Sequence, residues 1–290
     1  MKTIFFLSIF IFSSCCSISQ QMTLEEVEII DTHIHFFDTS RKEGVMWPPK
    51  NNKALHVPTF PKHFAEIAKE NNVKKAVVIQ ASNWVIDGQW NLDVTEKHSA
   101  FYPAVVCNLS TLGTKQFRTD IDALLKNPRI VGLRITHPPE SRPFFTVEML
   151  NDLKYIASKN LSLDILPFRF KFEDIIKIAD EIPNLKIMIS LFGKSDKEIK
   201  TIAARRNVYC KLTVPIQKNQ DLLSSYLKLI LHEFGENRMV FGSNWPGTKA
   251  EEYTLKKEFL FKFLQDARPS AVNKVFYKNA ELFYKLKNGR

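Results

Sequence analysis

A short stretch near the amino terminus limits the possible folds and chemistry of this chain more than any other. Within residues 28–38, an apolar run leads into His33 and His35, which are separated by one residue. On a β-strand, side chains alternate between the two faces, so both imidazoles should point the same way, with Asp31 on that face as well. Such a pair can hold a metal ion, or two oxygens of one substrate. The alternative is that these are merely polar residues where a strand enters a loop.

The rest of the chain alternates short apolar runs with helical patterns. After the first run, buried-strand runs occur at residues 75–80, 102–109, 130–135, 161–166, 186–191, 208–213 and 238–244. Helical patterns lie between them, at residues 117–126, 147–160, 172–181 and 222–234, and the tail from 251 to 286 should pack as helices outside the sheet. About eight buried parallel strands alternating with helices predict the α/β class, a single-domain (β/α)8 TIM barrel.

The loop after the first strand is unusually long. It runs from Arg41 to His63, is polar, and contains the sequence Trp47-Pro48-Pro49. A loop of this length in a compact domain is functional or disordered. Because this one leaves the carboxyl end of a strand, where barrel active sites lie, we expect it to cover the pocket. His56 and His63 are interpreted as loop and helix-start residues.

The composition narrows the class of partner. The chain has 290 residues and a formal net charge of +10, but its Lys and Arg are scattered. A nucleic-acid-binding protein would be expected to show a clustered basic stripe. General basicity instead favours a small anionic substrate. Cys107 and Cys210 lie in apolar runs far apart in the chain, so we expect two buried thiols and not a disulfide.

The first residues are expected to be a targeting signal. Lys2 precedes an apolar run from Thr3 to Phe12 that is too short to span a bilayer. The following Phe-Ser-Ser-Cys resembles a bacterial lipoprotein cleavage box, which predicts a signal peptide over residues 1–15, a lipid-anchored Cys and a barrel domain over 16–290. The membrane would be contacted only through that anchor, in the bacterial envelope. The alternative is cleavage near Ser19, which would leave a free periplasmic protein.

Polar residues at the carboxyl ends of the predicted strands are candidates for the site. Gln80 and Arg134 lie at two such ends, and Arg134 could bind a substrate carboxylate or pair with a barrel acid. Asp164 and Lys211 should face the barrel interior, as a catalytic base and a substrate-binding residue or as an ion pair. The last strand ends in Asn244.

Several motifs together are similar to one enzyme family. They are Ile-Asp-Thr-His-Ile-His-Phe-Phe-Asp, Gly-Leu-Arg-Ile, Pro-Asn-Leu-Lys-Ile-Met-Ile with a later Gly-Lys, Tyr-Cys-Lys-Leu, Phe-Gly-Ser-Asn-Trp-Pro and a closing Asn-Ala. In this order they resemble the amidohydrolase-related branch of the amidohydrolase superfamily, within it the lactonase-like group of fuconolactonase and pyrone-dicarboxylate lactonase type. The resemblance covers nearly all of the chain after the signal. It implies a distorted (β/α)8 barrel that hydrolyses small cyclic esters, often of sugar acids.

Two departures from the family pattern bear on catalysis. Where the family has Asp-His after the sixth strand, this chain has Ser190-Leu191, and Asn244 replaces the Asp that serves the family as water-activating base and metal ligand. An amide cannot accept the proton in that step. His33 and His35 are then the matched metal ligands, which predicts one weakly held divalent ion such as zinc, or none.

Three interpretations follow from these departures. The first is a hydrolase of a carboxylated or sugar-derived lactone, working without metal or with a relocated base, for which Asp164 is the candidate. The second is a barrel decarboxylase in which Arg134 holds the acid. The third is a binding protein on a degenerate barrel. An inward acid without a partner would favour catalysis, whereas an Asp164–Lys211 pair would favour binding or a structural role.

Overall fold

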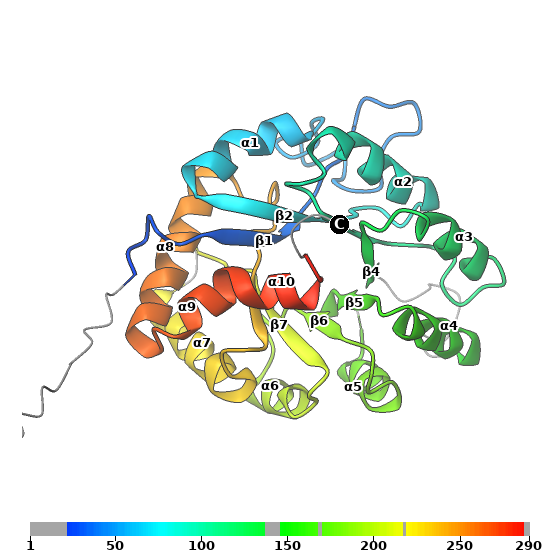
Figure 1. The fold of residues 1–290 in the computed structure, drawn as a ribbon. Coiled ribbons are helices and arrows are strands. Elements are labelled where there is room, and N and C mark those ends of the chain that lie inside the picture. The colour runs from blue at the N-terminus through cyan, green and yellow to red at the C-terminus, as the bar shows by residue number, and fades with distance from the viewer. Residues whose placement is uncertain (1–21, 137–145, 168–169, 217–218, 287–290) are drawn as a thin grey trace, which may run out of the picture.

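Eight parallel strands form a nearly closed barrel with helices around it, so the predicted single-domain (β/α)8 TIM barrel is confirmed (Figure 1). The computed structural model describes residues 22–136, 146–167, 170–216 and 219–286. The strands are β1 (Ile29–Ile34), β2 (Val73–Ile79), β3 (Ala104–Cys107), β4 (Ile130–Ile135), β5 (Ser162–Ile165), β6 (Ile187–Ile189), β7 (Val208–Leu212) and β8 (Met239–Phe241). The expected signal over residues 1–15 lies outside the described residues.

The helices cover the outer surface of the barrel and one of its ends. They are α1 (Pro61–Glu70), α2 (Val85–Val94), η1 (Glu96–His98), α3 (Phe117–Leu124), α4 (Val147–Ser158), α5 (Phe172–Glu181), α6 (Asp196–Ala203), α7 (Gln220–Phe234), α8 (Ala250–Ala267), α9 (Ala271–Asn273), the π-helical turn η3 (Lys274–Lys278) and α10 (Asn279–Phe283). Within the described ranges, none of these helices combines the length and apolar character needed to cross a bilayer.

Each strand pairs with its neighbours in the chain, from β1 to β8. The ends of this sheet meet where the backbone N–H of Asn244 donates to the His33 carbonyl at 2.9 Å and Ile34 bridges Trp245 in parallel. Because parallel strands all point the same way, their carboxyl ends gather on one rim of the barrel. The two histidines and the residues after β8 are thereby brought together.

Side chains alternate strictly along most strands. In β6, for example, Ile187 and Ile189 pack in the layer between strands and helices, while Met188 packs inside the barrel. This alternation explains the continuous apolar runs, since both faces of each strand are buried. Cys107 and Cys210 are free and buried in the outer layer, as predicted.

The carboxyl-terminal segment closes the amino end of the barrel, which the sequence did not predict. The Lys75 ammonium at the start of β2 donates to the Leu286 carbonyl, and the Asn279 amide donates to the Met239 carbonyl at the start of β8. From α10, which crosses the barrel in Figure 1, the chain leads to Tyr284, whose side chain packs inside the barrel. Only the earlier part of the tail, α8, lies outside it, beside α1 and α7 (Figure 1).

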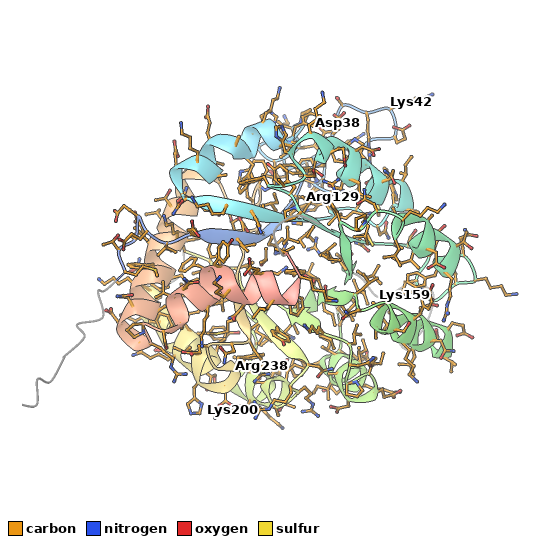
Figure 2. All side chains as sticks on the ribbon, in the orientation of Figure 1. Asp38, Lys42, Arg129, Lys159, Lys200 and Arg238 are labelled. Atoms are coloured by element: carbon orange, nitrogen blue, oxygen red, sulfur yellow. The ribbon has the colours of Figure 1, made fainter. Side chains whose placement is uncertain are left out.

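The positive charge is spread around the molecule. Lys42, Lys159 and Lys200 come from three separate segments, and charged side chains extend outward all round the barrel (Figure 2). The net charge of +10 therefore has the scattered distribution expected from the sequence.

Candidate active site

The two histidines meet at the carboxyl end of β1. The Nε2 atoms of His33 and His35 lie 3.2 Å apart, and the rings are perpendicular with their centroids 4.9 Å apart. Asp31 does not share their face, contrary to the expectation. A register irregularity between Asp31 and Ile34 interrupts the alternation, and the Asp31 carboxylate instead accepts from the backbone N–H groups of His33 and Ser243 at 3.0 Å.

The environment keeps both imidazoles neutral. Burial, together with the smaller effect of the nearby Arg134 charge, lowers the pKa of His35 to about 3. Burial also lowers the pKa of His33 well below its ordinary value, with Lys211 as the largest charge contribution. Removing an imidazole from water disfavours its charged form, and nearby cations act in the same direction. At neutral pH the pair is therefore uncharged.

A backbone carbonyl fixes the tautomer of His35. Its Nδ1 lies 2.6 Å from the Ile79 carbonyl oxygen, which can only accept, so Nδ1 carries the hydrogen. The Nε2 atom of neutral His35 consequently has a lone pair, directed toward His33. The Nδ1 atom of His33 is buried and has no hydrogen-bond partner among the residues that the structure describes.

A buried ion pair lies deeper in the barrel. Lys211 Nζ lies 2.6 Å from Asp164 Oδ2 and donates to the Thr32 carbonyl at 2.9 Å. From the amino end, the Tyr284 hydroxyl donates to Asp164 Oδ2 at 3.0 Å. Burial lowers the pKa of Lys211 despite the adjacent Asp164. Asp164 thus faces the interior as expected, and the structure realises its pairing with Lys211. Tyr284 was missed, because nothing in an aromatic-rich tail marks one tyrosine as entering the barrel.

Arg134 lines the same pocket but has no ion pair among the described residues. It lies in register with Asp164 on the neighbouring strand, is 8% exposed, and donates to the Gln80 carbonyl at 3.3 Å. Burial lowers its pKa to about 10, and Asp164 partly offsets this effect. Arg134, His33, Asp164, Lys211 and Ser190 supply the polar lining of this pocket.

Asn244 lies beside the histidines, in a turn held by buried contacts. Its backbone is left-handed, with φ of +64°, which asparagine tolerates better than most residues. The Asn244 side chain faces His35. The buried Lys256 ammonium donates to the Ser243 carbonyl and to Thr248, which anchors the turn to α8. Lys256 is a positioning residue that its place in a helical pattern did not reveal.

The alternation decides which residue after β6 faces the site. Ser190 lines the pocket, and its hydroxyl lies 2.8 Å from that of Thr213. Leu191 is fully buried in the outer layer, where its carbonyl accepts from Tyr226. The position from which a side chain could reach the histidines is therefore 190.

Gln80 points away from the pocket, so its predicted role in substrate binding is not supported. The preceding Ile79 faces the barrel interior, and alternation turns Gln80 outward. Its amide donates to the carbonyls of Ser82, Trp84 and Asn108 and accepts from the Asn108 N–H, which occupies the whole group. Gln80 instead joins the loops after β2 and β3.

The side chains in place do not fit a catalytic zinc site. Two imidazole nitrogens 3.2 Å apart can share one ion, but such a site uses about three protein ligands. The neighbouring groups are the Asn244 amide and the Ser190 hydroxyl, which are neutral. No set of three His, Cys, Asp or Glu side chains suited to a metal ion occurs in the part of the chain that the structure describes.

Comparison with known proteins places this geometry in a family. A family model described as amidohydrolase matches residues 30–286. An uncharacterised protein of Sinorhizobium fredii, y4mH, is 22% identical over 91% of this chain and 100% of its own length. A zinc-bound amidohydrolase structure from Burkholderia multivorans has a TM-score of 0.78 at 16% identity, covering 89% of this chain and 99% of its own.

A second structure has a similar fold. It is a probable 2-pyrone-4,6-dicarboxylic acid hydrolase from Acinetobacter baumannii with bound citric acid, with a TM-score of 0.67 and 15% identity, covering 89% of this chain and 99% of its own. At these identities the two structures establish the shared barrel. The family model, which spans most of the chain, shows that this protein belongs to the amidohydrolase family.

Proposed function

We propose that this amidohydrolase opens the ring ester of a small carboxylated or sugar-derived lactone, and that Arg134 binds the carboxylate. The observation that carries the proposal is Arg134 itself, a buried guanidinium that lines the pocket without an ion pair among the described residues. Its planar donors suit a carboxylate in a bidentate geometry. The hydrolase structure with bound citric acid supports an anionic ligand in this fold.

Ring opening requires a proton acceptor for the attacking water. Asp164 suits this role poorly, because its carboxylate is already bonded to Lys211 and Tyr284. Asn244 is an amide and cannot accept the proton. The remaining acceptor is the lone pair on His35 Nε2, which lies 3.2 Å from His33 Nε2, so the attacking water must replace that single neutral contact. Water then attacks the carbonyl carbon as His35 takes its proton, the ring C–O bond breaks, and the released alkoxide takes up that proton from His35.

The substrate itself would adjust His35 for this role. The charge of Arg134 contributes to the low pKa of His35. A carboxylate bound to Arg134 would neutralise that charge and raise the pKa of His35, which makes the imidazole a better base. Binding of the correct anion and activation of the base would thus be linked.

A metal ion is not needed for these steps. Zinc bound to the Burkholderia protein supports a divalent ion in this fold. In this chain the corresponding ligands would be His33 and His35 alone. Two imidazoles beside a neutral amide should hold such an ion weakly.

A specific observation favours a second function, that of a binding protein. The Asp164 carboxylate, which faces the pocket, is part of an ion pair, and this arrangement suits a pocket that binds without catalysis.

Calorimetry and turnover measurements with one panel of lactones distinguish the hydrolase, the binding protein and the decarboxylase. The panel is 2-pyrone-4,6-dicarboxylate, a sugar-acid lactone and uncharged δ-valerolactone. Ring opening of a carboxylated member supports the hydrolase, binding without turnover supports the binding protein, and release of carbon dioxide would indicate the decarboxylase.

A further inference from the structure

The long loop after β1 forms a strap over the site, here defined as residues 38–60. Its two ends are tied together, because Phe37 and Thr59 form an antiparallel bridge with hydrogen bonds of 3.0 and 2.8 Å. Between these ends the strap is irregular. Within it, His56 Nδ1 lies 2.7 Å from the Pro48 carbonyl. The bridge fixes only the base of the loop, so contacts along its length decide where it lies over the site.

One ion pair fixes the strap to α2. The Arg41 guanidinium contacts both oxygens of Asp87, at 2.7 and 2.9 Å, and also donates to the Gly44 carbonyl at 2.7 Å. It lies over the rings of Trp84 and Trp90, at 5.4 and 5.9 Å from their centroids. The pair is largely buried, with side-chain exposures of 16% for Arg41 and 9% for Asp87. A planar, stacked, bidentate contact of this kind is geometrically specific.

The strap places one aromatic ring directly against the active site. The Trp47 ring lies edge-on to His35, with centroids 5.2 Å apart, and also packs against Phe37 at 5.4 Å. His35 is 3% exposed. A crevice beneath the strap is lined by Trp47, Arg41 and Asp87, so the ring and the ion pair belong to one structural unit.

From these contacts we infer that Trp47 is the wall that controls access to His35, and that Arg41 is a positioning residue holding this wall through Asp87. A ligand reaching the imidazole must fit beside the indole ring, so Trp47 determines which ligands fit. The inference deepens the proposed function but does not depend on lactone chemistry, because access to His35 can be measured without any substrate.

The test is chemical labelling of histidine with diethyl pyrocarbonate, located by peptide mass spectrometry. The exposed His232 provides an internal reference rate. In the Trp47→Ala variant, His35 should react at least about tenfold faster relative to His232. Arg41→Gln should also accelerate His35, because removing one partner of a buried pair favours local opening by a comparable factor.

A control variant removes a pair of the same bidentate geometry, but more exposed, elsewhere in the barrel. Arg205 binds both oxygens of Asp180, at 2.9 Å each, far from the strap. Arg205→Gln should therefore leave the labelling of His35 unchanged. Trp47→Phe retains a ring at the position and should remain closer to wild type than Trp47→Ala. An unchanged urea midpoint in each variant shows that the fold is intact.

The outcomes are distinct from those of the lactone panel. If the rate of His35 labelling is unchanged in Trp47→Ala, Trp47 does not control access to His35. Acceleration in Trp47→Ala together with unchanged labelling in Arg41→Gln overturns the role of Arg41. Equal acceleration in Arg205→Gln would mean that loosening is global and would also reject the inference. Protection of His35 by Trp47 in a protein that opens no lactone would leave the inference standing while the proposed function fails.

Discussion

Asp164 and Lys211 form a buried ion pair across the barrel interior, although β6 separates their strands. Their side chains have exposures of only 7% and 4%, and Tyr284 completes the network from the amino end. A carboxylate held in this way is part of the framework of the pocket. The pair also leaves Arg134 as the cation that lines the pocket without an ion-pair partner among the described residues.

This relationship predicts a non-additive effect on stability. Lys211→Met leaves a buried carboxylate without its cation and should lower the free energy of unfolding by about 3–5 kcal/mol. Replacing both residues, with Asp164→Leu and Lys211→Met, should recover most of that loss. Urea denaturation measures both. Arg205→Met, which breaks the more exposed pair with Asp180, serves as control and should cost about 1 kcal/mol or less. A double variant as unstable as Lys211→Met would show that the pair is not the cause.

The direction of residue 190 leads to a prediction about metal binding. Asn244→Asp combined with Ser190→His adds a carboxylate and a third imidazole around His33 and His35. Zinc affinity should then rise by more than about 100-fold over wild type, because a three- or four-ligand set replaces two imidazoles. Isothermal titration with zinc measures it.

The comparison for this metal prediction is Leu191→His with Asn244→Asp, the substitution suggested by the family sequence pattern. Leu191 is fully buried among apolar side chains. The new imidazole should therefore destabilise the fold by about 1–3 kcal/mol and add no ligand. Tighter zinc binding in this variant than in the Ser190→His one would contradict the side-chain directions described above.

The two buried thiols predict the behaviour of the protein in alkali. Burial raises the pKa of Cys107 and Cys210 from 9.0 to about 12. Above pH 9 the thiols of the unfolded chain ionise while those of the folded chain do not. Their contribution to stability is therefore complete below pH 9 and is lost as the pH rises toward 12.

Thiol labelling at increasing pH checks this directly. Iodoacetamide should leave Cys107 and Cys210 unmodified in the folded protein at pH 9 but alkylate both in urea, as located by mass spectrometry. The Cys107→Ala/Cys210→Ala variant should lose stability less steeply between pH 9 and 12. Rapid alkylation of either cysteine in the folded state would reject its assignment as a buried, protonated thiol.

The barrel could be predicted from sequence because its signal is local. Apolar runs of six to eight residues identify strands that are buried on both faces, and the helical periodicity between them leaves few alternative folds. The same alternation placed Asp164 and Lys211 correctly in the interior. It failed at Asp31, where an irregularity in β1 shifts the pattern by one residue. The Gln80 prediction is wrong for another reason: it rests on the position of Gln80 at a strand end, whereas alternation after the inward-facing Ile79 turns Gln80 outward. A shift of one residue reverses the face of a side chain.

The contacts that complete the site could not be predicted, because they join segments remote in sequence. Tyr284 reaches Asp164 across 120 residues, and Arg41 reaches Asp87 across 46. The periodicity of a sequence carries no information about contacts between side chains so far apart in the chain. Whether Ser190 or Leu191 faces the pocket depends on where the short strand β6 ends. A family motif alone does not give that position. The length of the strap did indicate that it covers the pocket, but not that Trp47 would be the ring against His35.

The central claim is that Arg134 selects a carboxylated lactone for hydrolysis. The most direct test compares kcat/KM for a carboxylated lactone with that for its uncharged methyl ester, in wild type and in Arg134→Met. Removing the guanidinium should lower kcat/KM for the carboxylated lactone by roughly 100-fold or more, equivalent to a few kcal/mol, and leave the ester nearly unchanged. The claim would be contradicted if wild type and Arg134→Met opened the carboxylated lactone and its methyl ester equally well.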